Sequence, residues 1–89
     1  MAGQYLQVTY RHGRPFAAYY YLPRQSGDRS CRSEVAGPGL VVDFRSDGRP
    51  IGIELTAPDK VSLAALNKVL LDLGLPLASA EDLAPLPAA

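Results

Sequence analysis

The first third of the chain alternates between apolar and polar residues. A period of two is typical of a β-strand with one buried face. In the first such segment Leu6 and Val8 share one face, while Gln7 and Thr9 share the other. The alternation predicts strands over residues 4–10 and 16–22, and a short polar strand over residues 30–35.

The clearest local pattern is a β-hairpin in the middle of the chain. Two apolar segments, residues 40–44 and 51–55, flank Asp47 and Gly48. Asp-Gly between such segments is typical of a two-residue type I′ turn, which needs positive φ at both central residues. This turn predicts three cross-strand pairs on one face of the sheet: Phe44 with Ile51, Val42 with Ile53, and Leu40 with Leu55.

Beyond residue 60 the apolar residues recur at the spacing of one helix face. Ser62 is suited to the N-cap position, and Gly74, with Pro76 beyond it, ends the helix. The pattern predicts a helix over residues 62–73 and a loose C-terminal tail over about residues 75–89. The apolar stripe consists of Leu63, Leu66, Val69, Leu70 and Leu73, with Asn67, Lys68 and Asp72 outside it.

Together these segments predict one α+β domain over residues 1–89, with the sheet within about residues 4–56. The expected fold is a small antiparallel β-meander of four to five strands with one packed C-terminal helix. The helix and the sheet each have one apolar surface, and they have only each other to bury it against. Within the tail, Ser79 is expected to cap a short turn over residues 81–83.

The overall composition is that of a globular protein, with 47% hydrophobic and 20% charged residues. Nine basic and nine acidic residues give a net charge of zero. That balance argues against non-specific binding of nucleic acid, which needs a basic surface. It also leaves little charge repulsion between copies, so self-association is favoured.

The sequence contains no stretch of about 20 apolar residues, so no membrane span is expected. Its first residues lack the charged start and apolar stretch of a signal peptide, so the expected location is the cytoplasm. The single cysteine, Cys31, excludes an internal disulfide and a cysteine-based zinc site.

The residues of the predicted hairpin, together with an earlier strand, resemble the sequence pattern of a known family. Residues 41–55 read Val-Val-Asp-Phe-Arg-Ser-Asp-Gly-Arg-Pro-Ile-Gly-Ile-Glu-Leu, and residues 17–22 read Ala-Ala-Tyr-Tyr-Tyr-Leu. Over about residues 5–70 the chain resembles the small bacterial family called domain of unknown function 2283. That family usually has acidic residues before its second strand, where this chain has residues 11–15, Arg-His-Gly-Arg-Pro. The resemblance implies a bacterial protein with a small antiparallel sheet and a helix, and it implies no activity.

Two carboxylates are candidates for chemistry. Asp43 and Glu54 fall on the same sheet face, one diagonal step apart in the predicted register. Such a pair can bind a divalent cation or act as acid and base. The alternative is a solvated face on which Arg45, or an arginine of a neighbouring strand, balances the charge. Because no histidine or third acid joins them, they make a poor metal site, and no metal or cofactor is expected.

Three other residues are candidates for a functional or structural role, although they form no motif. His12 lies in a polar break between strands, with no serine or cysteine tied to it, so an exposed turn residue is the favoured interpretation. Cys31 is flanked by arginines at positions 29 and 32, yet a bystander thiol is favoured over a reactive one. Gly52 is expected to leave flat space for a neighbouring aromatic ring.

The tyrosines form the most informative cluster. Strand alternation places Tyr19 and Tyr21 opposite Tyr20, and therefore on the side of Asp43 and Glu54. Tyr5 is expected to join them, with Val41 nearby. Such a face is more apolar than contact with solvent requires, and tyrosine is enriched at protein interfaces. The alternative is that the C-terminal tail folds across this face and covers it.

These patterns leave two hypotheses for the function. The first is a non-enzymatic interaction module that uses the tyrosine-bearing face to form a homodimer or to bind a small protein partner, as the antitoxin of a toxin–antitoxin pair does. The second is a small metal- or small-molecule-binding enzyme that works through the two carboxylates. The candidate interaction face consists of Tyr19, Tyr21, Val41, Asp43 and Glu54.

Overall fold

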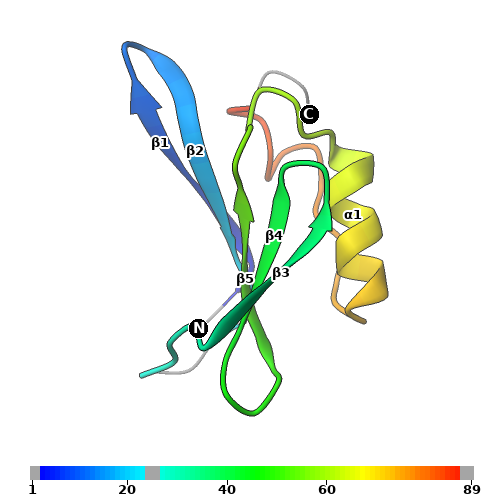
Figure 1. Cartoon of the computed structure of the whole chain (residues 1–89). Coiled ribbons are helices and arrows are strands. Elements are labelled where there is room, and N and C mark those ends of the chain that lie inside the picture. Colours follow the sequence, from blue (N-terminus) through cyan, green and yellow to red (C-terminus); the bar gives the residue numbers. More distant parts are fainter. Residues whose placement is uncertain (1–2, 24–26, 87–89) are drawn as a thin grey trace.

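The computed structural model describes residues 3–23 and 27–86, and it shows one antiparallel sheet backed by one helix (Figure 1). The predicted α+β class is confirmed, and so is the polar third strand. The elements are β1 (Tyr5–Arg11), β2 (Arg14–Tyr21), β3 (Arg32–Gly37), β4 (Leu40–Phe44), β5 (Pro50–Leu55) and α1 (Leu63–Asp72).

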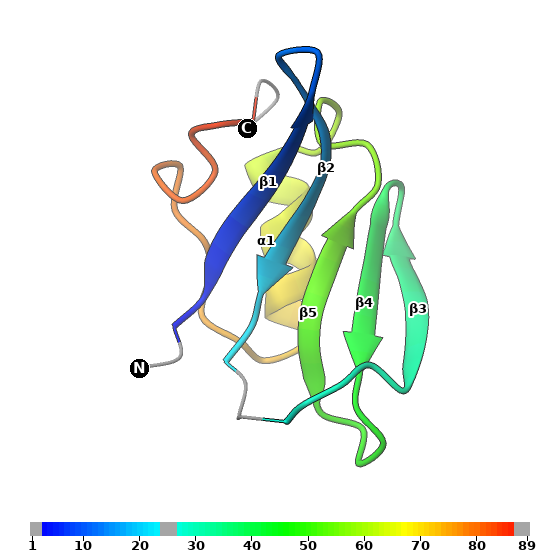
Figure 2. The ribbon, with the colours of Figure 1, turned by 90° about the vertical axis from the view of Figure 1, so that its left-hand side faces the viewer.

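The sheet has the strand order β1-β2-β5-β4-β3. The chain meanders through β3, β4 and β5, and β5 then pairs with β2, which joins the meander to the first hairpin. The helix α1 lies behind the sheet when the sheet is viewed as in Figure 2. The sheet therefore has an inner face toward α1 and an outer face on the opposite side.

A type I′ turn is present, but it connects β1 and β2. His12 and Gly13 have φ angles of 54° and 76°, so both central residues of this two-residue turn lie in the left-handed region. The predicted polar break is confirmed, and His12 occupies the turn as expected.

The predicted register of β4 and β5 is partly wrong. Leu40 pairs with Leu55 and Val42 with Ile53, as predicted, but Phe44 pairs with Pro50 instead of Ile51. The register shifts between Asp43 and Phe44, and Ile51 is the extra residue of β5. Ile51 is nevertheless buried, so the bulge costs the core no apolar side chain.

The cause of this shift lies in the turn. The Gly48 N–H donates to the Arg45 carbonyl at 2.9 Å, and the Arg45 N–H donates to the Arg49 carbonyl at 3.0 Å. Only Gly48, with φ of 90°, is left-handed in this loop. These bonds define a turn centred on Ser46 and Asp47 and followed by a left-handed glycine, which makes a three-residue loop in place of the predicted two-residue one.

The helix α1 has the predicted caps, and its bounds agree with the prediction within one residue. The Ser62 Oγ accepts the Ala65 N–H at 3.1 Å, which confirms the N-cap. At the other end Gly74 has φ of 72°, and the N–H groups of Gly74 and Leu75 donate to the carbonyls of Leu71 and Leu70. These two bonds form a Schellman motif, which ends the helix.

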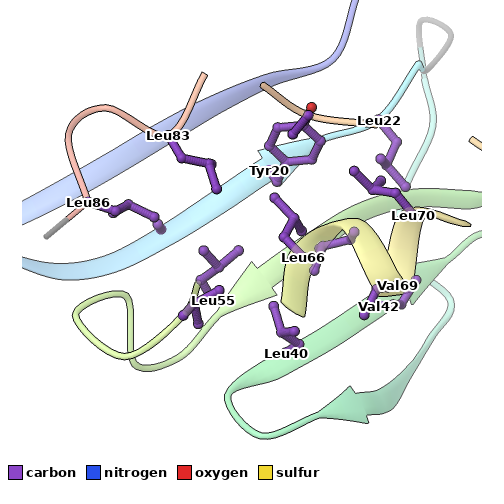
Figure 3. Close-up of a cluster of buried hydrophobic side chains, with 14 residues drawn as sticks. Tyr20, Leu22, Leu40, Val42, Leu55, Leu66, Val69, Leu70, Leu83 and Leu86 are labelled. Atoms are coloured by element: carbon purple, nitrogen blue, oxygen red, sulfur yellow. The ribbon is translucent and has the colours of Figure 1, made fainter. Parts of the chain in front are cut away.

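The core lies between α1 and the inner face of the sheet (Figure 3). Tyr20 is buried in it, and desolvation raises the pKa of its hydroxyl, while a hydrogen bond from Gln4 opposes this shift. The buried cluster consists of Ala18, Tyr20, Leu22, Leu40, Val42, Ile53, Leu55, Val61, Leu66, Val69, Leu70, Ala78, Leu83 and Leu86.

The prediction of a loose C-terminal tail is wrong for residues 75–86; residues 87–89 lie outside the described part of the chain. Leu83 and Leu86 are buried in the same core as α1, beside β1 and β2 (Figure 3). A helix of ten residues is about 15 Å long, which is too short to cover the inner face of five strands. The tail covers the part of that face that α1 leaves open.

Side-chain hydrogen bonds attach the tail to α1 and shape its short turn. The Asn67 amide forms two hydrogen bonds with the backbone of Ala78, of 2.7 and 3.0 Å. Ser79 and Asp82 each accept the other's backbone N–H, so the predicted cap at Ser79 is confirmed. Because the tail packs on the inner side, the alternative that it covers the outer face is wrong.

Candidate interaction face

Two rows of side chains cross the outer face from β1 to β3. The cross-strand partners place Tyr5, Tyr21, Gly52, Asp43 and Ser33 in one row, and Gln7, Tyr19, Glu54, Val41 and Val35 in the next. We call these ten residues the tyrosine face. Figure 2, which looks onto this face, shows no described segment in front of it. All five predicted candidate residues therefore lie on it, together with Tyr5.

Asp43 is the polar centre of the tyrosine face. This residue is 9% exposed, and its two carboxylate oxygens accept hydrogen bonds from the Tyr19 hydroxyl at 2.8 Å and the Ser33 hydroxyl at 2.6 Å. Arg45, which was expected to balance this charge, instead pairs with Asp28 at 3.0 Å and Asp47 at 3.4 Å. The carboxylate is therefore stabilised by hydroxyl donors and serves as an anchor for the Tyr19 ring.

Gly52 makes this anchor possible. A Cβ atom built on Gly52 would overlap the hydroxyl oxygen and the ring carbons of Tyr19. The ring therefore lies directly on the backbone of β5, as the sequence predicts for this glycine. Without a side chain at position 52, Tyr19 from β2 reaches across β5 to Asp43 on β4.

The three outer tyrosines form one continuous aromatic row. Tyr19 and Tyr21 meet edge to face, with ring centroids 4.8 Å apart, and Tyr21 stacks on Tyr5 at 4.7 Å. The Tyr21 hydroxyl donates to the Gln7 side chain at 2.9 Å. These contacts fix the rings in the isolated chain, so little side-chain entropy remains to be lost when a partner binds.

The arrangement gives little support to metal or acid–base chemistry. Both oxygens of Asp43 already accept hydroxyl donors, whereas Glu54 is exposed one diagonal step away. No cluster of three metal-ligating side chains occurs among the described residues. The two rows also lack lysine and arginine, which a stacking platform for nucleic acid needs next to its aromatic rings.

The other two singled-out residues lie apart from this face. His12 is at the tip of the β1–β2 hairpin, and Cys31 is exposed just before β3, at the opposite edge of the sheet. The structure therefore does not bring Cys31 to the histidine. In the described part of the chain no helix is long and apolar enough to cross a membrane.

No protein-family model, curated protein or solved structure matches this chain. The resemblance to the family called domain of unknown function 2283 stays a prediction. What the chain does is therefore inferred from its own geometry.

Proposed function

We propose that the chain is a non-enzymatic, cytoplasmic interaction module that forms a homodimer through the tyrosine face. The observation that carries this proposal is the continuous row of Tyr5, Tyr21 and Tyr19 on a sheet face that no described segment covers. The core lies on the other side of the sheet, so this row contributes little to it.

The composition of the face favours a protein partner. Tyr5 is 55% exposed and Val35 is 79% exposed, so large apolar side chains meet solvent at both ends of the rows. Rigid tyrosines offer a large contact area at a low entropic cost, and they are enriched among the residues that dominate binding energy.

The face also suits a second copy of itself. Asp43 is buried and hydrogen-bonded, which leaves Glu54 as the single exposed charged residue in the two rows. A two-fold contact between two flat, nearly uncharged surfaces therefore meets little like-charge repulsion. Because the net charge of the chain is zero, the rest of the chain adds no net repulsion between the two copies.

The size of the face limits the area that a dimer can bury. Five strands about 4.8 Å apart and about six residues long outline a flat area of about 24 by 20 Å. Side-chain relief raises the accessible area above this projection, toward the roughly 800 Å² that each partner buries in a standard interface. A face at the small end of that range is consistent with a dimer that dissociates in the micromolar range.

The experiment is a dilution series followed by amide NMR. Backbone signals of the strands that carry the two rows should shift as the protein is diluted through the micromolar range, because their environment changes on dissociation. Signals of α1, on the far side of the sheet, should stay in place. Shifts confined to α1 or to the tail would contradict the proposal, as would signals that never move.

A further inference from the structure

The strand β3 is an open edge of the sheet. It is the last strand in the order β1-β2-β5-β4-β3, its residues 32–36 are all exposed, and Figure 2 shows no described segment beyond it. The opposite edge differs, because the C-terminal segment is tied to the residue before β1 by a 2.9 Å hydrogen bond from Gln4 to the Pro76 carbonyl. An open edge offers unpaired N–H and C=O groups to another strand.

We propose that β3 pairs antiparallel with β3 of a second copy, with the two-fold axis at Ser33. This contact is separate from the tyrosine face. An axis perpendicular to the sheet keeps every side chain on its own face, and directly opposed residues of an antiparallel pair share a face. Opposed residues must therefore differ by an even number, so the axis passes through a residue position and never between two residues.

The charges of Arg32 and Glu34 favour an axis at Ser33 over an axis at the neighbouring positions. An axis at Ser33 places Arg32 opposite the partner's Glu34, and Glu34 opposite the partner's Arg32. An axis at Glu34 would instead oppose two glutamates, and like charges directly opposite are destabilising. Within one chain Arg32 and Glu34 already form an ion pair, so the two chains together would hold a ring of four alternating charges.

The outer side of the strand agrees with this register. An axis at Ser33 places Val35 opposite the partner's Cys31. Among the described residues, Val35 is the most exposed large apolar residue. The Cys31 N–H donates to the Phe44 carbonyl at 2.7 Å, which holds Cys31 beside β4 directly before β3. The pairing joins two sheets into one, with both tyrosine faces on the same side.

A disulfide tests the register directly. In Val35→Cys the new thiol should lie opposite the partner's Cys31, at a Cα separation of about 4.5–5.5 Å, which a disulfide can span. The two cysteines of one chain lie about 13 Å apart along the strand, which excludes an internal disulfide. Mild oxidation should give covalent dimers about tenfold faster than in the wild type, because paired strands raise the effective concentration of the thiols.

Two sets of variants serve as controls. Cys31→Ser combined with Val35→Cys should cross-link slowly, whereas a register centred on Val35 would make it cross-link fast. In the Val35→Cys background, Glu34→Arg should abolish rapid cross-linking, and the further change Arg32→Glu should restore it. Slow cross-linking of Val35→Cys itself, or no effect of the charge changes, would overturn the proposal.

The edge contact and the tyrosine face can be tested apart. Tyr5→Arg, added to Val35→Cys, should leave the cross-linking rate unchanged, since Tyr5 lies on β1 at the far edge of the sheet. If Tyr5→Arg abolishes rapid cross-linking, the edge contact does not exist on its own and the inference is overturned. Failure of the edge proposal would not change the result that we expect from the dilution experiment on the tyrosine face.

Discussion

At position 52, only a residue without a side chain leaves room for the ring of Tyr19. Gly52→Ala should displace that ring and break its 2.8 Å hydrogen bond to Asp43. We expect a loss of about 1–3 kcal/mol in the free energy of unfolding, measured by urea denaturation. The loss should disappear when Tyr19→Ala is already present, because no ring then occupies the space.

Gly37→Ala is the matched control. A Cβ atom at Gly37 would meet only the Leu40 side chain, at 3.6 Å, which is an ordinary contact distance. Its effect on stability should therefore be small. Equal losses for the two glycine substitutions would show that the loss comes from the glycine backbone and not from the Tyr19 ring.

Individual residues of the tyrosine face were predictable to different degrees. The alternation of the strands was enough to put Tyr19, Tyr21, Asp43 and Glu54 on one side, and to expect a ring over Gly52. The partners of Asp43 were not predictable, because Ser33 reaches it only through the pairing of β3 with β4. That pairing depends on the strand order, about which local sequence carries little information.

Among the elements, the hairpin turns at Asp47 and at His12 show why a turn type is hard to predict. A glycine in the second position suits both a type I′ turn and a turn that ends in a left-handed glycine. At Asp47 the second is favoured, because its carboxylate accepts the Arg49 N–H at 2.9 Å while its own φ stays negative. At His12 no such bond competes, and the turn takes two left-handed residues.

The helix α1 also binds the C-terminal tail, which its apolar stripe does not predict. Asn67 and Lys68 both lie outside the stripe, but only Asn67 binds the tail. Asn67→Ala should therefore cost about 1–3 kcal/mol in the free energy of unfolding, because it leaves the N–H and carbonyl of Ala78 without partners.

Lys68→Ala is the control on the neighbouring position. Its ion pair with Asp72 is long, at 3.4 Å, and both side chains are exposed, so its loss should be nearly silent. Hydrogen exchange of the Ala78 amide should accelerate in Asn67→Ala alone. Equal stability and equal exchange in the two variants would contradict the role given to Asn67.

On the scale of the whole molecule, the described residues cover the sheet on one side only. Sequence periodicity predicted the sheet, the helix and their contact, because each has a single apolar surface. Periodicity does not predict the burial of the tail, because Leu83 and Leu86 are separated by alanine and proline and follow no helical or strand period. Their burial follows from the length of α1 relative to the width of the sheet, which only the assembled fold reveals.

The central claim is that the uncovered tyrosine face holds two copies of the chain together. Light scattering at concentrations of tens of micromolar tests it most directly in Glu34→Arg, the variant that should lack the β3 edge contact. Glu34→Arg should have a mass of about 19 kDa, twice the 9.5 kDa of one chain. Adding Tyr5→Arg should give 9.5 kDa, whereas adding Tyr10→Arg, at an equally exposed position outside the two rows, should keep the dimer mass. A Glu34→Arg variant of 9.5 kDa, or a double variant with Tyr5→Arg that remains dimeric, would contradict the account.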